Sequence, residues 1–388
     1  MTRQFIPLSD YEVPALATEA SLRRLLRDAS RIVTRKTDDP VMAADRMRRT
    51  AEGILDDLAP PPACAPLMAE MDDTYLGWTG TPVPDAWLRL VVLPPGDPDR
   101  LVENWARRHG HRVIDPPLRS DLVTADPPAL STLRNIDPEG QGVLVIPRLE
   151  RWFLRHRNGL GHLRGLLDWL GGLERHCLIG CDSWAWSFAQ KAASAETRLP
   201  APKTFAPFDA ARLHAWFDSL REEEGETRIF RLANTGEDVF ETGEDGTPEC
   251  SWFTNLAARS HGIPWIAWTL WRHSLRYGLE KDDGEEPPQD AAPAGEDTLW
   301  IVEPEERLVP DRPDRAATLV LQALLLHGPL TVAELDAVLP MPHLSDSIPA
   351  LVTAGLIRRE GDAFLIVPAA YPEIREAIAA DGIARDVI

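Results

Sequence analysis

Short apolar segments alternate with amphipathic segments between residues 87 and 180, and this alternation restricts the fold more than any other feature. The apolar segments predict strands at 87–93, 111–114, 142–146 and 177–180, and the segments between them predict helices at 100–109 and 151–170. A continuous apolar run, such as GVLVI at 142–146, is typical of a strand that is buried on both faces. Strands that alternate with helices form parallel sheets. The sequence therefore predicts an α/β domain.

The chain on either side of this region predicts further domains. The predicted division is an N-terminal helical arm at 1–84, the α/β domain at 85–225, a helical lid at 226–280, an acidic linker or loop at 281–297 and a C-terminal domain at 298–388. The arm rests on helical spacing of apolar residues, including Met42, Met47 and Ile54. Within the C-terminal domain, the sequence predicts a strand at 299–302, helices at 316–326, 332–339 and 344–353, and a hairpin at 356–367.

Composition excludes several classes of function. The 41 Lys and Arg residues against 61 Asp and Glu residues give a net charge of −20 at pH 7, which repels nucleic-acid backbones and anionic lipids. The four cysteines lack paired CxxC spacing, so neither a structural zinc site nor a secreted disulfide framework is predicted. No signal-peptide core and no apolar run of membrane-spanning length occurs in the sequence. We therefore expect a cytoplasmic protein without membrane insertion.

The loop at 94–100 (PPGDPDR) lies between the first predicted strand and the first predicted helix, where a phosphate-binding loop would lie. Such a loop needs backbone N–H groups from glycines and a lysine ammonium that reaches the outer phosphates. The chain has four lysines, at positions 36, 191, 203 and 281, and none of them follows a glycine. One glycine, Gly96, remains in the loop, and Asp97 and Asp99 would face the phosphates.

The order of the predicted elements resembles an AAA+ or STAND-type P-loop ATPase module over residues 85–388. In that module a first strand and phosphate loop are followed by a Walker B strand, a sensor-1 strand, a helical lid and a winged-helix domain. The strand at 142–146 stands at the Walker B position, but Pro147-Arg148-Leu149-Glu150 follows it instead of an Asp-Glu pair. The segment 177–183 stands at the sensor-1 position, where Asp182 or Ser183 could contact a γ-phosphate.

This resemblance implies a parallel-sheet P-loop-like domain with an N-terminal helical arm, a helical lid and a C-terminal winged helix. The segment 256–264 resembles the junction of small residues in such lids, and Arg272 or Arg276 resembles a sensor-2 arginine. The residues that would contact a nucleotide, if nucleotide binding is retained, are Gly96, Asp97, Glu150 and Asp182. No catalytic residue, metal ligand or bound cofactor is predicted, and ATP is the one cofactor left open.

Other clusters of functional side chains have structural explanations. His109 and His111 lie at a predicted helix end without a third ligand nearby, which favours solvent-facing side chains over a metal site. A second cluster consists of His176, Cys177, Cys181 and Asp182. Buried cysteines behave as small hydrophobes, and Gly180 is expected to end this strand, so a structural role is favoured. Most tryptophans in the middle of the chain have the spacing of core residues, although an anchor for a partner stays open; they are Trp152, Trp169, Trp184, Trp186, Trp265, Trp268 and Trp271.

The predicted winged helix lacks the cations that DNA recognition requires. Such a domain reads DNA with polar or basic side chains on its third helix and with cations in its wing. No Lys or Arg occurs between Arg315 and Arg358, and the third predicted helix carries Asp346. Over residues 315–388, five arginines and nine acids give 5 − 9 = −4. Only Arg358 and Arg359 could contact phosphate, which is too few charges for useful affinity at physiological salt.

These features predict a catalytically inactive AAA+/STAND-like adaptor or regulatory subunit that acts through a protein partner or as a homo-oligomer, with DNA an unlikely partner. One alternative is a weakly active ATPase of an oligomeric assembly, in which Glu150 works with an arginine from a neighbouring subunit. The candidates for that arginine are Arg148, Arg151, Arg155 and Arg157. The other alternative is a winged-helix DNA-binding regulator.

Overall fold

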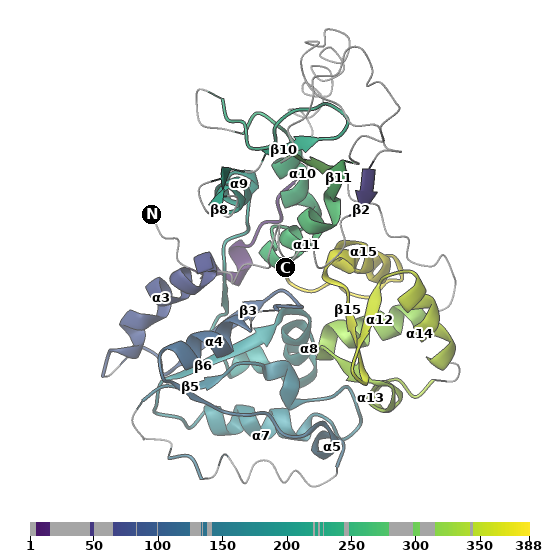
Figure 1. Ribbon diagram of the computed structural model, residues 1–388. Coiled ribbons are helices and arrows are strands. Elements are labelled where there is room, and N and C mark those ends of the chain that lie inside the picture. The colour runs from purple at the N-terminus through teal and green to yellow at the C-terminus, as the bar shows by residue number, and fades with distance from the viewer. Residues whose placement is uncertain are drawn as a thin grey trace, which may run out of the picture. The chain divides into compact units, whose positions relative to one another are not determined.

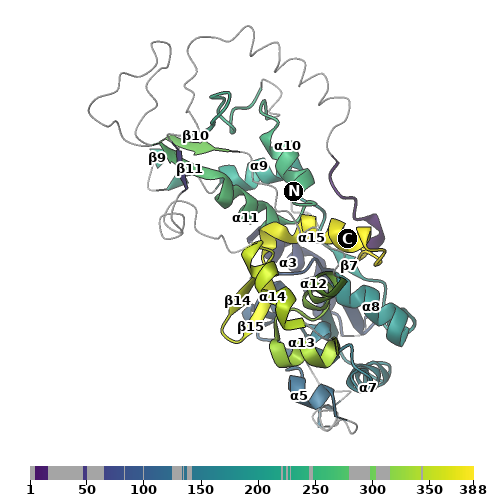
Figure 2. The same ribbon diagram turned by 90° about the vertical axis from the view of Figure 1, so that its right-hand side faces the viewer.

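The computed structural model describes residues 5–15, 47–49, 65–82, 84–98, 100–124, 133, 135–137, 142–219, 222–223, 226–227, 229–243, 248–278, 298–302, 315–341 and 344–388. The chain forms two compact units (Figures 1 and 2). Unit 1 consists of Met1–Glu12, Ala63–Ala206 and Arg307–Ile388, and unit 2 consists of Val13–Pro62 and Pro207–Glu306. Most of the predicted helical arm and the acidic segment 281–297 lie outside the described residues.

A six-stranded sheet forms the centre of unit 1, in the order β1-β7-β3-β6-β5-β4 (Figure 1). The strands are β1 (Ile6–Pro7), β3 (Leu88–Leu93), β4 (Arg112–Val113), β5 (Leu144–Ile146), β6 (Cys177–Asp182) and β7 (Lys203–Thr204). Every neighbouring pair is parallel except β1 and β7. The predicted α/β class with a parallel sheet is confirmed. The prediction that Gly180 ends its strand is wrong, because Gly180 pairs with Val91 and the ladder continues to Asp182.

Helices cover the sheet of unit 1. They are α3 (Ala65–Thr79), α4 (Leu101–Arg108), α5 (Arg119–Leu122), α7 (Gly161–Leu170) and α8 (Ser183–Ala193), with the 3-10 helices η1 (Leu8–Asp10), η3 (Leu149–Trp152) and η4 (Ala195–Thr197). Helix α4 packs against β4 and β5, and α8 packs against β3 and β6. The helix predicted at 151–170 begins only at Gly161, because a tight loop precedes it in which Leu154 N donates to the Gly159 carbonyl over 3.1 Å.

Residues 315–388 form a C-terminal module within unit 1. Its helices are α12 (Arg315–His327), α13 (Val332–Val338), α14 (Leu344–Thr353) and α15 (Tyr371–Ala380), with the short η5 (Pro368–Ala370). Its sheet has the order β13-β15-β14, formed by β13 (Leu330–Thr331), β14 (Ile357–Glu360) and β15 (Ala363–Ile366). These elements confirm the predicted helices and hairpin, and Thr331 and Glu334 form the capping box of α13. Helix α12 packs against α8 and η3, which joins the module to the sheet domain.

Unit 2 combines helices with a four-stranded sheet, in the order β10-β12-β11-β2, and a separate pair of strands, β8 and β9. The helices are α9 (Ala210–Asp218), α10 (Trp252–Arg259) and α11 (Pro264–Ser274), and the strands are β2 (Met47–Arg49), β8 (Glu222–Glu223), β9 (Glu226–Thr227), β10 (Ile229–Leu232), β11 (Leu275–Gly278) and β12 (Thr298–Ile301). The region predicted as a helical lid therefore also contains strands. Strand β12, predicted to belong with the C-terminal domain, pairs with β10 and β11. Met47, predicted to be helical, lies in β2 because this segment pairs with β11.

Aromatic side chains fill the cores of both units. Phe217, Phe253 and Trp271 contact one another in unit 2, with ring centroids 5.3 to 6.1 Å apart. Six of the seven tryptophans named above are buried, which confirms a core role for them; they are Trp152, Trp184, Trp186, Trp265, Trp268 and Trp271. Among the described residues, no helix combines the length and the apolar character needed to cross a membrane.

Candidate functional site

Two loops and one strand–helix junction of unit 1 meet at one edge of the sheet. Strands β3, β6 and β5 are adjacent and parallel, so their carboxyl ends lie side by side. Leu93 at the end of β3 is in register with Asp182 at the end of β6, directly before helix α8. Ligands of parallel sheets bind at this edge, beyond the carboxyl ends of the strands. The candidate residues of the sequence lie in the loops after β3 and β5 and at the junction of β6 with α8.

The loop after β3 turns at Gly96, which has a φ of 79°, and leads into helix α4. The first residue of that helix, Leu101, donates its backbone N–H to Asp97 Oδ2 over 2.6 Å. Arg100 precedes the helix in the left-handed conformation, with a φ of 46°, a conformation that is uncommon for residues other than glycine. Backbone N–H groups at a helix N-terminus are the donors that bind phosphate in nucleotide-binding loops. Here a carboxylate of the protein itself uses one of them.

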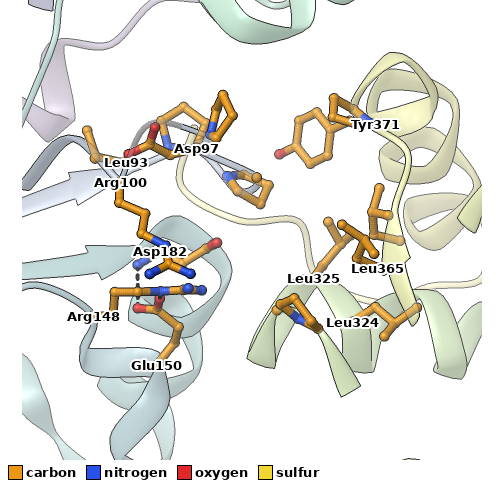
Figure 3. A pocket seen from close by; sticks show the side chains of 18 of the residues that line it. Leu93, Asp97, Arg100, Arg148, Glu150, Asp182, Leu324, Leu325, Leu365 and Tyr371 are labelled. Carbon is orange, nitrogen blue, oxygen red and sulfur yellow. Dashed lines mark hydrogen bonds and ion pairs between the residues drawn. The ribbon is translucent and has the colours of Figure 1, made fainter. Parts of the chain in front are cut away.

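Glu150 connects the loop after β5 to the junction of β6 with α8 through hydrogen bonds. This residue lies in η3 and is only 4% exposed. Its Oε1 accepts a hydrogen bond from Arg148 Nε over 2.6 Å, and its Oε2 accepts one from the backbone N–H of Asp182 over 3.3 Å. Asp182 caps helix α8, since its Oδ1 accepts from Trp184 N over 3.1 Å. Figure 3 shows Arg148, Glu150 and Asp182 together on one side of a pocket.

Arg148 is the cation within this group of acids. Burial acts to lower the pKa of Arg148, but the charges of Glu150, Asp182 and Asp97 and the hydrogen bond to Glu150 raise it above its usual value. Burial and the charge of Glu150 raise the pKa of Asp182 well above its usual value. The Arg148 guanidinium also reaches the C-terminal module, because a Cβ added at Gly328 would lie 3.1 Å from Arg148 Nη2. Arg148 is therefore paired with Glu150 and lies near Asp182 and Asp97.

The pocket at this edge has a volume of about 360 Å³. Its polar side carries Gly96, Asp97, Arg100, Arg148, Glu150 and Asp182. Its opposite side belongs to the C-terminal module and carries Leu324, Leu325, Leu365 and Tyr371 (Figure 3). Further lining residues of the module are Ile366, Pro368, Arg358 and Glu360. The pocket therefore has one charged side and one mainly apolar side, and the module adds the charged pair of Arg358 and Glu360. The apolar side comes from residues more than 140 positions later in the chain than Asp182.

The structure brings the four predicted contact residues together. Gly96, Asp97, Glu150 and Asp182 all line the pocket, and their binding of a nucleotide stays a prediction. Arg148 was a candidate for an arginine that acts on a neighbouring subunit, against the ordinary expectation that such arginines are solvated or pair with nearby acids. The structure shows the pairing for Arg148, with Glu150 two residues later as the partner. The contribution of the C-terminal module to the pocket had no signal in the sequence.

The other candidate clusters belong to the packing of unit 1. His109 is half-buried instead of solvent-facing, because its Nε2 lies 2.7 Å from Asp72 Oδ1 on helix α3. Cys177 and Cys181 are buried in β6, and burial raises the pKa of both thiols, to about 12 for Cys177. The described part of the chain contains no group of three His, Cys, Asp or Glu side chains arranged to hold a metal ion.

His327, the last residue of α12, fixes the C-terminal module to the sheet domain. Its Nε2 accepts a hydrogen bond from the Arg155 backbone N–H over 3.2 Å, and its carbonyl oxygen accepts one from Arg119 Nη2 over 2.5 Å. Arg155 Nη1 also donates to Gln322 Oε1 over 2.7 Å. Burial, together with the charges of Arg119, Arg155 and Arg151, lowers the pKa of His327 well below its usual value. The folded protein therefore holds this imidazole neutral.

Acidification is expected to cost stability through His327. The unfolded chain takes up a proton at this histidine below a pH of about 6.5, whereas the folded chain does not until a much lower pH. The unfolded state therefore binds more protons in this window, and the free energy of unfolding falls as the pH falls. From pH 7 to pH 5, wild type should lose about 2 kcal/mol more than a His327→Gln variant. Urea unfolding of both proteins at the two pH values measures this difference. The carboxyl groups titrate in both proteins, so their contribution to the pH dependence cancels in the comparison. Equal losses would contradict the prediction.

Comparisons with known proteins find matches among solved structures. No family model matches the chain. No curated protein matches it either. Among solved structures, a RuvB mutant of Thermotoga maritima is 14% identical and covers 74% of this chain and 86% of its own, with a TM-score of 0.28. The ORC2 protein of Aeropyrum pernix is 11% identical and covers 91% of this chain and 98% of its own, also with a TM-score of 0.28. At these scores, the likenesses add nothing to the fold described above.

Proposed function

We propose that this chain is a catalytically inactive AAA+/STAND-like adaptor or regulatory subunit, which keeps a P-loop-like pocket but has lost nucleotide hydrolysis. The observation that carries the proposal is the position of Arg148. Its guanidinium pairs with Glu150 and lies within reach of the charges of Asp182 and Asp97. In an active site of this class, acids at these positions would meet Mg²⁺ and a triphosphate.

The residues at the sheet edge do not fit a triphosphate. The loop at 94–100 supplies no lysine, and Asp97 accepts the N–H at the start of α4 that a phosphate would need. Arg100 lies within ion-pair distance of Glu103, at 3.7 Å, and Arg148 pairs with Glu150. Both cations on this side of the pocket are therefore engaged with carboxylates of the chain, while the carboxylate of Asp97 would repel a phosphate.

Calorimetry and a turnover assay test the proposal directly. Titration of the full-length chain with ATP and Mg²⁺ should give no binding heat in the micromolar range and no release of inorganic phosphate. Micromolar binding together with turnover would overturn the inactive assignment. If turnover is found, Glu150→Gln decides whether Glu150 is responsible, since its loss in the variant would favour the oligomeric-ATPase alternative.

The structure offers that alternative limited support. Two of the arginines that could act on a neighbouring subunit are engaged within the chain, because Arg148 pairs with Glu150 and Arg155 binds Gln322. Arg157 is exposed and Arg151 is half-buried, so these two are left as candidates. Size-exclusion chromatography with light scattering provides the relevant measurement. A monomer mass would favour action through a different protein, whereas a larger mass would favour a homo-oligomer.

We interpret the C-terminal module as a winged helix that packs against protein and does not read DNA. The two wing arginines lie beside acids, with Arg358 Nη2 3.4 Å from Glu360 Oε2 and Arg359 Nη2 3.5 Å from Asp362 Oδ1. Exposed pairs of this kind are weak, but they reduce the charge that the wing presents to a phosphate. We expect no shift of duplex DNA in a gel at physiological salt. A shift that weakens with added salt and disappears in an Arg358→Ala/Arg359→Ala double variant would restore the DNA-binding alternative.

A further inference from the structure

The segment 383–388 follows α15 and returns to the sheet domain. Asp386 and Ile388 are buried, whereas Arg385 and Val387 are exposed. The described structure assigns no helix or strand to this segment. It is attached through the carboxylate of Asp386 and through the carbonyl oxygen of Ile388, which accepts a hydrogen bond from Arg375 Nη2, and not through a ladder between strands. Segments with so few buried contacts open at a lower free energy than the core does.

Asp386 is the centre of that attachment. Its Oδ2 accepts hydrogen bonds from Ser183 Oγ over 2.5 Å and from Tyr371 OH over 3.1 Å, and its Oδ1 accepts one from Arg375 Nε over 3.0 Å. Tyr371 in turn accepts a hydrogen bond from Trp184 Nε1 over 3.2 Å. Ser183 and Trp184 begin helix α8 of the sheet domain, whereas Tyr371 and Arg375 belong to α15 of the C-terminal module. The carboxylate of Asp386 and the hydrogen bond from Trp184 to Tyr371 thus connect α15 to helix α8, beside the packing of α12 on α8.

This attachment adjoins the pocket on both sides. Ser183 directly follows Asp182, which lines the polar side, and Tyr371 itself lines the apolar side. The charge of Asp386 also acts on Asp182. A second attachment, through His327, Arg119 and Arg155, joins the module to different elements, α5 and the loop after η3. Loss of the contacts at Asp386 would therefore leave the module attached at His327.

We propose that the segment 383–388 is a latch, in which Asp386 holds α15 of the C-terminal module against helix α8 and so restricts access to Cys181 in the pocket. Release of Asp386 weakens the attachment of α15 to α8, where the hydrogen bond from Trp184 to Tyr371 remains, and widens the pocket. The module stays attached through His327 and through the packing of α12. The inference concerns access to the pocket and holds whether or not the pocket takes a nucleotide.

The electrostatics of Asp386 agree with a latch that opens. Burial raises the pKa of Asp386 even though Arg375, Ser183 and Tyr371 act to lower it. The ionised carboxyl group is therefore less well stabilised in the closed position than in water. Release of Asp386 restores the hydration of its carboxyl group. The three donors, Ser183, Tyr371 and Arg375, can then bind water instead.

Two cysteines of β6 supply a matched test. Cys181 lines the pocket and is 3% exposed, whereas Cys177 begins the same strand, is fully buried and does not line the pocket. In a chain that carries Cys64→Ser and Cys250→Ser, modification by N-ethylmaleimide is followed at both positions by peptide mass spectrometry. Cys181 reports the opening of the pocket, and Cys177 reports the unfolding of the sheet.

Asp386→Ala should accelerate modification of Cys181 by at least about tenfold, because hydrogen bonds to a charged group shift an opening equilibrium by roughly that factor. Modification of Cys177 should stay at its original rate. Ser183→Ala removes only one contact and should give a smaller acceleration, again confined to Cys181. Arg385→Ala is the control, because this neighbouring side chain is exposed and pairs with Glu376 instead.

Two outcomes would overturn the proposal. Unchanged modification of Cys181 in both variants would show that Asp386 does not control access to the pocket. Equal acceleration of Cys181 and Cys177 in both variants would show that the network stabilises the whole unit. Because Ser183→Ala leaves Tyr371 and Arg375 in place, it decides the question if Asp386→Ala fails to fold.

Discussion

Replacing Arg148 by methionine is expected to destabilise unit 1 by about 2–3 kcal/mol at pH 7. The change preserves most of the side-chain volume but leaves Glu150, which is 4% exposed, without its cation. Removal of one partner of a fully buried ion pair costs about 3–5 kcal/mol. The expected loss is smaller here because the Arg148 side chain is 32% exposed, so water screens part of the charge. Native-state amide exchange of β3 and β6 measures the free energy of opening for this unit.

The double variant Arg148→Met/Glu150→Gln separates charge from packing. If the loss arises from an uncompensated carboxylate, the second change should recover more than half of it. Arg157→Met is the matched control, since Arg157 is exposed and its replacement should change stability by less than about 0.5 kcal/mol. A loss of the same size in the control would contradict the assigned role of Arg148.

Gly180→Ala is expected to cost about 3 kcal/mol or more, at the upper end of what overpacking of a core costs. A Cβ added at Gly180 would lie 2.2 Å from the carbonyl oxygen of Pro147 and 3.1 Å from Val102 Cγ2. The first of these contacts is with backbone, which cannot rotate away as a side chain does. Relief requires β5 and β6 to separate, which would also move Arg148 and Glu150. Loss of soluble protein or a large fall in the melting temperature measures the effect.

Gly77→Ala is the matched control for this prediction. Gly77 lies inside helix α3, and an added Cβ there would meet nothing within 4 Å. Alanine should stabilise the helix by about 0.5–1 kcal/mol, because it loses less conformational entropy than glycine does on folding. A cost below about 1 kcal/mol for Gly180→Ala would show that the loop after β5 can shift freely.

Part of the candidate site could be predicted because the carboxyl ends of neighbouring parallel strands lie at the same edge of the sheet. Gly96, Asp97, Glu150 and Asp182 each follow an apolar segment, and parallel strands place such residues at one edge. The absence of a phosphate-binding lysine from the loop at 94–100 could also be recognised, because it depends on which residue types occur in that loop. The partner of Arg148 could not be named, because it is set by the turn after β5, and a sequence pattern does not show which way that turn directs a side chain.

Unit 2 shows where local patterns failed. Met47 has neighbours at helical spacing, but its strand is set by pairing with residues 276–278. Strand β12 lies next to the C-terminal module in sequence, yet it pairs with β10 and β11. In both cases a partner distant in the chain overrides the local preference, and this is the common reason that β-strands escape prediction from a single sequence.

The sequence by itself determined the α/β class, the parallel sheet and the absence of a phosphate-binding lysine, because these follow from the alternation of apolar and amphipathic segments and from the residue types of one loop. Only the tertiary structure decided that Arg148 pairs with Glu150, that the C-terminal module lines the pocket, and that Asp386 binds Ser183 across 203 positions. Such contacts depend on how separate elements pack against one another, and the hydrophobic periodicity of the individual elements does not encode them.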